Sequence, residues 1–445
     1  LTDLPVFNVT EGRLAGVMTL SIPRTGRLSA KYRTAKRTVS LAASSWQDFD
    51  DATGSLSAEL AGTTAATSEY RLSVAVAADG VVSLAFVDPT VTEGALAVSA
   101  PVVEWAKTKP ATDYKGYYTV SLPGVGKDSP TVATQVLSGT PLTKGDGYLT
   151  LKMNTTAALN SGKFAYAGVY PNGTSFSGSA VVTAMWDDEL GKCYFGLVPV
   201  VSASSKDSVV GALAIRPGAM DKTAQDYDPA TQTCGGYCYY ETVRRSVYGH
   251  EDAPLVWTHT DLTEETSWSV ALDVQGGIYN SGDNFVNCCN SALGTSRLTF
   301  FVQGEGLGET AYGTFTSWVT NTTGIAVSYA SKTGNAIKLV NTSNKYGLTL
   351  SYTASTGVVS GKFKLPMSGG SVWVEYRGIV MPGWGSNTCN DCGLGGVEAS
   401  YRPFISGTAW LEDSGSFDYT TTRGKIKDLK VRRSVPITIG VEAGK

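Results

Sequence analysis

The chain has 445 residues, of which 42% are hydrophobic and 17% charged, and its formal net charge at pH 7 is -3. This length predicts about two to four domains, and the hydrophobic content excludes a disordered chain. The lack of a basic field argues against nucleic acid as a partner. No apolar run approaches the roughly 18–20 residues of a membrane helix, so we expect no membrane span.

The polar residues are mainly Ser, Thr, Asn and 50 glycines, and the chain contains 22 tyrosines. β-Branched and aromatic side chains fit a pleated sheet, while glycine supplies turns. Alternating runs such as 70–86 and 345–363 are interrupted by turn residues at intervals of about 8–12 residues, as in sandwiches and barrels. The predicted fold is all-β, with tandem small antiparallel β-barrel or sandwich domains and internal hairpin repeats.

The first predicted domain covers residues 1–108 and contains hairpins over 19–32 and 72–86. Asp79-Gly80 marks the turn of the second hairpin, because these residues tolerate φ > 0. The stretch 107–112, KTKPAT, is the predicted linker to the next domain.

The second predicted domain covers residues 113–249 and contains the hairpin LTLKMNTTAALNSGKF, residues 149–164. Seven of its sixteen positions are identical in LTLSYTASTGVVSGKF, residues 348–363 of the third predicted domain (250–413). Repeats of this kind indicate tandem supersecondary units. Two further echoes support the repeat: an aromatic-x-Gly step after each hairpin and the segment VRRSV, at Phe176–Gly178, Tyr376–Gly378, Val243–Val247 and Val431–Val435.

Two acidic clusters are candidate sites. Asp48, Asp50 and Asp51 precede Gly54 and crudely resemble a calcium loop, but the glycine spacing is wrong and the Glu at position twelve is missing. Trp186–Glu189 could supply paired carboxylates for glycoside hydrolysis. Its position between two strand patterns favours a solvated hairpin turn instead.

The two histidines, His250 and His259, lie in one stretch with Glu251, Asp252 and Asp261. A metal or acid–base site is conceivable there, but a hydrated linker between domains is the favoured interpretation. The chain contains no GxSxG, HExxH, P-loop or dinucleotide motif. We therefore predict no enzymatic activity, no cofactor and no metal.

All seven cysteines fall between Cys193 and Cys392. CxxC pairs can bind zinc, but the irregular spacing favours disulfides of an oxidised, extracellular compartment. We expect Cys234 to pair with Cys238, and one residue of the pair Cys288 and Cys289 to pair with Cys389 or Cys392. The odd number leaves one thiol free or bonded to another chain.

Aromatic side chains are the candidates for binding sugars. Trp373, Tyr376 and Trp384 offer flat rings for stacking on glycans, but Trp373 and Tyr376 fall on opposite faces of one strand. One of the two must therefore lie in a core. Five Asn-x-Ser/Thr triplets are potential glycan acceptors, at Asn8, Asn154, Asn172, Asn321 and Asn341.

The last predicted segment is a tail over 414–445 that completes no repeat. Its stretch 423–433 has six basic residues and one acid, followed by the apolar 434–441. Two interpretations stay open: an edge strand protected by lysines, and an assembly strand that pairs with another subunit. The assembly candidates are Lys430, Arg432, Arg433, Val435, Ile437 and Ile439.

The hairpin order resembles repeat modules of very large secreted or surface proteins of Verrucomicrobia, Lentisphaerae and Planctomycetes. In those modules LTL, a turn and SGxF precede an aromatic-x-Gly strand, and a later G-aromatic-F-L-G segment is echoed by Tyr401–Gly407 (YRPFISG). The resemblance covers about three quarters of the chain, and it implies small β-barrels in series, a surface location and no defined activity. The cysteines and the basic tail depart from the pattern.

These observations predict an extracellular structural protein of a bacterial surface, a subunit of a filament, layer or adhesive stalk. Self-association into a homopolymer is the expected partnership. A carbohydrate-binding surface module is the alternative, and a secreted hydrolase is a distant third.

Overall fold

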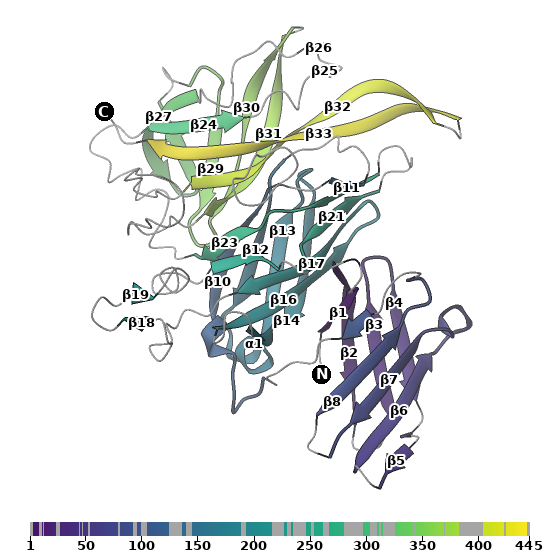
Figure 1. Ribbon diagram of the computed structural model, residues 1–445. Helices are drawn as coiled ribbons and strands as arrows, with labels where there is room; N and C mark the ends of the chain where they lie inside the picture. The colour runs from purple at the N-terminus through teal and green to yellow at the C-terminus, as the bar shows by residue number, and fades with distance from the viewer. Residues whose placement is uncertain are drawn as a thin grey trace.

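The computed structural model is built from antiparallel strands, and α1 (Thr156–Ser161) is the one α-helix among the residues that it describes. The all-β prediction is therefore confirmed. Figure 1 shows an N-terminal barrel, a central sheet and a C-terminal barrel following one another along the molecule. The described residues are 3–8, 11, 13–23, 27–43, 45–46, 48–51, 54–78, 81–91, 96–98, 105–123, 136–138, 145–187, 193–215, 227–228, 233–234, 246–250, 253–260, 267–279, 297–302, 309–310, 313–314, 325–340, 344–368, 370–381, 404–421 and 424–442.

The N-terminal barrel is a meander with strand order β4-β3-β2-β1-β9-β8-β7-β6-β5, and β4 also pairs with β6, which brings the sheet round on itself. Alternation decides its core: in β3, Leu28, Ala30 and Tyr32 point inward while the residues between them are exposed. Its elements are β1 (Leu4–Asn8), β2 (Arg13–Ser21), β3 (Leu28–Arg33), β4 (Thr38–Ala43), β5 (Asp48–Asp50), β6 (Ser55–Gly62), η1 (Ala65–Thr67), β7 (Arg71–Val76), β8 (Val82–Val87) and β9 (Leu96–Val98).

The central sheet has strand order β11-β22-β21-β17-β20-β23-β10-β12-β13-β14, with β16 on β17 and β15 on β16. The strands over 246–278 pair with β10, β11 and β17, so a domain boundary at 249 is wrong. Its elements are η2 (Thr112–Tyr114), β10 (Gly116–Leu122), β11 (Val136–Ser138), β12 (Gly147–Met153), α1, β13 (Lys163–Val169), β14 (Ser175–Val181), β15 (Thr183–Asp187), β16 (Cys193–Ala203), β17 (Asp207–Ile215), β20 (Ser246–Gly249), β21 (Val256–His259), β22 (Trp268–Ala271) and β23 (Gln275–Ile278), beside the separate pair β18 (Tyr227–Asp228) and β19 (Thr233–Cys234).

The stretch predicted as the first linker is packed on the central sheet. Trp105 donates its indole N–H to the Val182 carbonyl over 2.6 Å, and the Ala111 N–H donates to the Leu159 carbonyl over 2.9 Å. Ala111 is buried in the central core. The expected linker over 107–112 is therefore corrected: KTKPAT belongs to the central fold.

The C-terminal barrel is closed, in the order β24-β27-β28-β29-β30-β31-β32-β33. The last strand pairs on one side with β32 and on the other with β24, so the predicted separate tail is wrong: its end closes this barrel. The barrel's elements are β24 (Arg297–Val302), β27 (Ile325–Thr333), β28 (Ala336–Leu339), β29 (Thr349–Thr353), β30 (Val358–Met367), β31 (Gly370–Met381), β32 (Phe404–Thr421) and β33 (Gly424–Glu442), with the separate pair β25 (Glu309–Thr310) and β26 (Gly313–Thr314).

The predicted hairpins form as antiparallel pairs, β2–β3, β7–β8, β12–β13 and β29–β30. The two best copies differ in their turns. Leu151 pairs with Tyr166, whereas its counterpart Leu350 pairs with Gly361, which corresponds to Gly162. The partner is thus displaced by four residues, because 156–161 form α1 in the first copy whereas β30 has already begun at Val358 in the corresponding stretch of the second. An even displacement keeps every side chain on its face, so both terminal phenylalanines stay buried.

Among the described residues, buried contacts join the three bodies at two junctions. The N-terminal junction is an apolar cluster in which Leu14 and Val17 of β2 pack against Leu197 and Val201 of β16 and Ala212 of β17. Because these residues are buried on the outer side of β2, the N-terminal barrel presents an apolar stripe to the central sheet.

The C-terminal junction is held by hydrogen bonds. The Pro171 carbonyl accepts the hydroxyls of Thr408 over 2.8 Å and Ser434 over 2.6 Å, and Ser434 Oγ accepts the Gly145 N–H over 3.1 Å. Ser121 Oγ lies 2.7 Å from Ser406 Oγ. An apolar cluster of Tyr148, Val169, Ile379 and Met381 lies beside these bonds.

Candidate functional site

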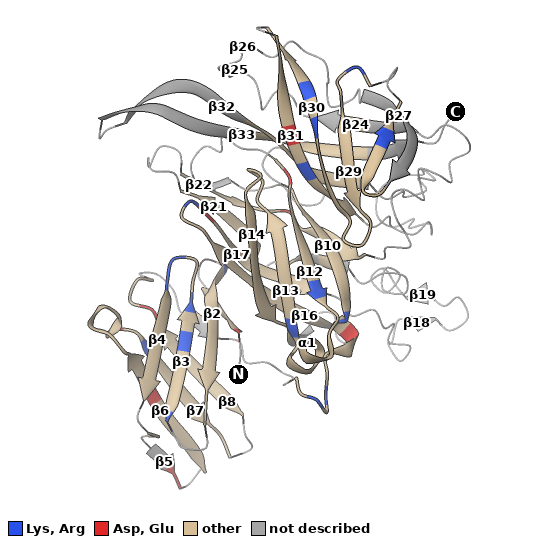
Figure 2. Cartoon of the chain, turned by 180° about the vertical axis from the view of Figure 1, so that it is seen from behind, with Lys and Arg blue, Asp and Glu red and all other residues tan. Residues whose placement is uncertain are grey.

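The C-terminal barrel carries an aromatic-basic face, which we define as Lys362 and Lys364 of β30 with Trp373, Glu375 and Arg377 of β31. Alternation along both strands places these five side chains outward. The ladder sets Lys362 opposite Glu375 and Lys364 opposite Trp373. Figure 2 shows these charges on the otherwise mostly tan strands β30 and β31.

Trp373 is the centre of this face. Its side chain is 44% exposed, which is unusual for an aromatic on a barrel strand. The Nζ atoms of Lys362 and Lys364 lie 4.7 Å and 5.2 Å from its ring centroid, so both ammonium groups make cation–π contacts with the indole. A flat apolar ring is therefore presented together with two positive charges.

Arg377 connects this face with the C-terminal junction. Its guanidinium lies 5.6 Å from the Trp410 ring centroid and donates to Ser175 Oγ of β14 over 3.2 Å. It lines two shallow hollows. The first hollow, of about 310 Å³, lies on the C-terminal barrel and is bordered by Thr349, Ser360, Gly361, Lys362, Glu375, Tyr376, Arg377 and Trp410. The second, of about 390 Å³, lies between the central sheet and the C-terminal barrel and is bordered by Tyr148, Thr150, Ala167, Gly168, Val169, Ser175, Phe176, Ser177, Val358 and Arg377.

The predicted sugar-stacking residues differ in their exposure to solvent. Trp373 is exposed, as stacking requires. Tyr376 is 1% exposed and donates its hydroxyl to the Thr349 carbonyl inside the barrel, so its assignment as a stacking residue is wrong. Trp384 lies outside the described residues. The expectation that either Trp373 or Tyr376 belongs to a core is confirmed.

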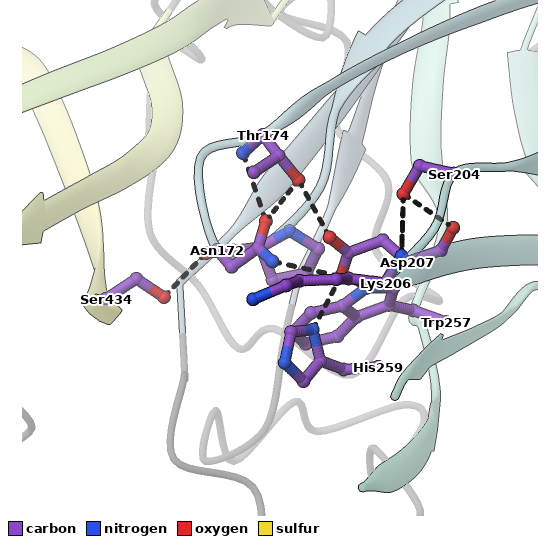
Figure 3. A network of polar contacts seen from close by, with 9 residues as sticks. Asn172, Thr174, Ser204, Lys206, Asp207, Trp257, His259 and Ser434 are labelled. Atoms are coloured by element: carbon purple, nitrogen blue, oxygen red, sulfur yellow. Dashed lines mark hydrogen bonds and ion pairs between the residues drawn. The ribbon is translucent and has the colours of Figure 1, made fainter. Parts of the chain in front are cut away.

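A second cluster surrounds Asp207, the first residue of β17 (Figure 3). Its Oδ1 accepts the Asn172 amide over 2.9 Å, the Trp257 indole N–H over 3.1 Å and His259 Nδ1–H over 2.8 Å. Thr174 Oγ1 lies 3.2 Å from Oδ2 and 2.7 Å from Asn172 Oδ1. The carboxylate thus joins the β13–β14 turn to β17 and β21.

The charge state of Asp207 follows from these contacts. Burial alone would raise the pKa of its carboxyl, but the hydrogen bond and charge of His259, with the Asn172 and Trp257 donors, outweigh it and lower the pKa. His259 stacks on Trp268 with ring centroids 4.4 Å apart. The imidazole is therefore oriented on both its edge and its face.

An Asp–His pair of this geometry can orient a general base. Nucleophilic catalysis would also need a hydroxyl or thiol at the second ring nitrogen. Among the described residues none hydrogen-bonds to that nitrogen, and the contacts that the structure gives the pair are those that join the β13–β14 turn to β17 and β21. The interpretation of the histidine stretch as a hydrated linker is wrong: His259 is on β21, and the His250 N–H bonds to the Ala212 carbonyl over 3.2 Å.

The remaining sequence candidates are the two acidic clusters and a metal site. Asp48 and Asp50 pair with β6 as part of β5, and Trp186 and Asp187 pair with β16 as part of β15. Asp188 and Glu189 lie outside the described residues, so the turn expected there stays a prediction. Within the described part of the chain, no group of His, Cys, Asp and Glu side chains is arranged to hold a metal ion. No helix there has the length and apolarity to span a membrane.

The cysteine pairings stay predictions. Cys234 is on β19 by its backbone, but its side chain, like those of Cys238, Cys288, Cys289, Cys389 and Cys392, lies outside the described parts. The glycan acceptors divide: Asn154 is exposed, whereas Asn8 and Asn172 are each 4% exposed. Asn321 and Asn341 lie outside the described residues. Because Asn172 also holds Asp207, we expect no glycan on it in the folded protein.

The assembly candidates lie on two parts of β33. Val435, Ile437 and Ile439 are buried in the core of their own barrel, so a role for them in contacting another subunit is wrong. Lys430, Arg432 and Arg433 are in the half of β33 whose ladder partner, among the described residues, is β32. Their side chains are outside the described parts. Figure 1 shows this yellow two-stranded ribbon extending past the other strands.

Sequence reasoning missed Asp207 and the two lysines beside Trp373, and it identified Asn172 only as a potential glycan acceptor. Lys362 and Lys364 could have been found, because they alternate with Phe363 and Leu365 in the hairpin repeat. Asp207 and Asn172 are isolated polar residues at strand ends, and their meeting depends on the sheet order.

No family model, curated protein or solved structure matches this chain. The resemblance to bacterial surface repeat modules therefore stays a prediction that rests on the hairpin motifs.

Proposed function

We propose that this chain is an extracellular structural protein, a rigid series of β-barrels that spaces or displays other parts of a bacterial surface assembly. The single observation that carries the proposal is the pair of buried junctions between the three bodies. A flexible tether would need exposed linkers, because few contacts then cross between domains.

The ribbon of β32 and β33 supports self-association. Past Trp410, β32 has only β33 as a partner among the described residues, and before Ile437, β33 has only β32. An isolated two-stranded hairpin is marginally stable in water. A neighbouring copy that paired with its edge would stabilise it through main-chain hydrogen bonds.

The ribbon can be tested without opening the barrel. Removing β33 would also remove the buried Ile437 and Ile439, so we would instead excise Ser414–Lys430 and bridge Asp413 and Val431, which pair directly, with an Asn-Gly turn. We expect the shortened protein to stay folded and to lose assemblies seen by light scattering and electron microscopy. Unchanged assemblies would refute the ribbon's role.

Rigidity is tested by small-angle X-ray scattering of the monomeric fraction. We expect one compact arrangement of the three bodies to account for the curve. A curve that requires freely hinged bodies would refute the structural role as a rigid spacer.

A second function, glycan binding at the surface, is favoured by the exposed Trp373 ring. Aromatic faces stack on flat ring systems, and polar neighbours set orientation. The outer face of β30 and β31 has both features.

A further inference from the structure

We propose that the aromatic-basic face binds an acidic polysaccharide, one whose sugar rings carry carboxylate groups. The inference rests on the proposed glycan binding and adds the ligand class. It follows from the combination of Trp373 with Lys362 and Lys364, whose ammonium groups lie over the ring. A sugar stacking on the indole would place its acidic substituent within reach of these same ammonium groups.

Charge complementarity selects an anionic ligand. The face carries three cations, Lys362, Lys364 and Arg377, against one carboxylate, Glu375. Lys345 adds another cation on the neighbouring loop, with Nζ 4.8 Å from the Tyr346 ring. This positive surface stands out in a chain whose net charge is -3, so it is a local feature.

The loop beside Trp373 is held in place before any ligand binds. Asn344 Nδ2 donates to the Leu348 carbonyl, and Asn344 Oδ1 accepts the Leu348 N–H, both over 2.8 Å. The Lys364 N–H donates to the Tyr346 carbonyl over 2.8 Å. At Gly347, which has φ +60, a Cβ would lie 3.2 Å from the indole. A preorganised loop and ring lower the entropic cost of binding.

The hollow that shares Lys362, Glu375 and Arg377 with the aromatic-basic face suits a sugar better than a nucleic acid. Ser360 offers a hydroxyl, and Glu375 offers a carboxylate that can accept bonds from sugar hydroxyls. A phosphodiester backbone has no hydroxyl to donate in DNA and would be repelled by Glu375. The hollow between Glu375 and Trp410 therefore fits a ligand with both hydroxyl donors and negative charges.

The test measures binding of the full chain to immobilised polygalacturonate, to neutral dextran and to single-stranded poly-dT. We expect polygalacturonate to bind at least tenfold more tightly than dextran or poly-dT, and its affinity to fall as salt is added, because exposed charges are screened. Trp373→Ala should weaken the binding of polygalacturonate at least tenfold. The double variant Lys362→Gln with Lys364→Gln should weaken it by at least as much.

The control variants are matched by chemistry and exposure. Lys31→Gln removes an exposed lysine from the N-terminal barrel, and Val87→Ala removes part of an exposed apolar side chain there. Both should bind polygalacturonate as the parent does. Trp373 is exposed, so its replacement leaves the barrel core filled, which near-ultraviolet circular dichroism checks.

Each of the other outcomes would refute one part of the proposal: the acidic ligand, the sugar, or the site itself. Equal binding of dextran and polygalacturonate, both lost in Trp373→Ala, would keep glycan binding and refute the acidic ligand. Tighter binding of poly-dT would assign the face to phosphate instead. Binding unaffected by Trp373→Ala, or no binding of any probe, would refute both the site and the proposed glycan binding, and it would leave the structural role to its own test.

Discussion

The two junctions of the molecule join barrels by different physical means. At the N-terminal junction, methyl and methylene groups of Leu14, Val17, Leu197 and Val201 are buried against one another. At the C-terminal junction, the Pro171 carbonyl accepts the hydroxyls of Thr408 and Ser434, beside the apolar cluster of Tyr148, Val169, Ile379 and Met381. Apolar burial is non-directional, whereas hydrogen bonds require particular distances and angles.

The difference indicates how orientation is set. The apolar junction supplies association and tolerates small rotations, while the hydrogen-bonded junction determines the register of the C-terminal barrel on the central sheet. A turn with Gly173 at φ +85 packs against Trp410 at that junction. The proposed rigid series therefore depends on buried apolar area at both junctions and, at the C-terminal one, also on hydrogen-bond geometry.

The largest expected effect is at the apolar junction. Leu14→Ala removes a buried side chain, which costs about 2–5 kcal/mol in well-packed sites. We expect the N-terminal barrel to unfold in a separate, earlier transition by calorimetry. Ile22→Ala, at an exposed side chain of the same barrel, should leave one transition in place. A single unchanged transition in Leu14→Ala would show that Leu14 does not contribute to the coupling at this junction.

The next effect is at the close contact of Gly173 with Trp410. In Gly173→Ala a Cβ would lie 2.6 Å from the indole, at a φ that non-glycine residues rarely adopt. Strain and overpacking together should cost about 2–4 kcal/mol. Gly334→Ala is the matched control, because Gly334 has φ +58 and nothing within 4 Å of the added Cβ. Chemical denaturation should give a clearly smaller loss for it, and equal losses would mean that packing on Trp410 is immaterial.

A smaller effect is expected at the hydrogen-bonded junction. Ser434→Ala leaves the Gly145 N–H without its acceptor and removes one of two donors to the Pro171 carbonyl. A buried unsatisfied group costs about 1–3 kcal/mol. Small-angle X-ray scattering should also require a wider range of orientations of the C-terminal barrel, since its orientation is less restrained. Ser360→Ala, at an exposed residue of β30, is the control, and an identical loss there would refute the role of the junction.

The sequence predicted the fold class and its hairpins because both depend on local patterns. Alternation in 345–363 places Phe363 inward and Lys362 outward whichever sheet forms. The domain boundaries were wrong because they depend on pairing between distant strands: β23 joins β10, and β33 closes on β24. Neither pairing leaves a signal in neighbouring residues.

The candidate site was predicted in part for the same reason. Trp373 was identified from its residue type, and its neighbours Lys362 and Lys364 come from the paired strand. Tyr376 was wrongly retained because alternation shows that two positions differ in face without showing which one is inside. The Asp207 network needs three elements from separate parts of the chain, so only the folded structure brings it together.

The smallest expected effect is a change of stability with pH, and it sharpens the comparison because the Asp207 network lies beside the C-terminal junction. The pKa of Asp207 is lowered in the folded protein, so the unfolded chain binds more protons near the ordinary pKa of about 3.9. Its contribution to the free energy of unfolding is therefore complete above that pKa and lost as the pH falls through the lower folded value. Denaturation from pH 6 to pH 3 should show a steeper loss in the parent than in Asp207→Asn, which cannot titrate. Asp51→Asn, at an exposed turn carboxylate, should keep the parent's steep loss. Equal slopes for the parent and Asp207→Asn would show that His259 and Asn172 do not stabilise the carboxylate.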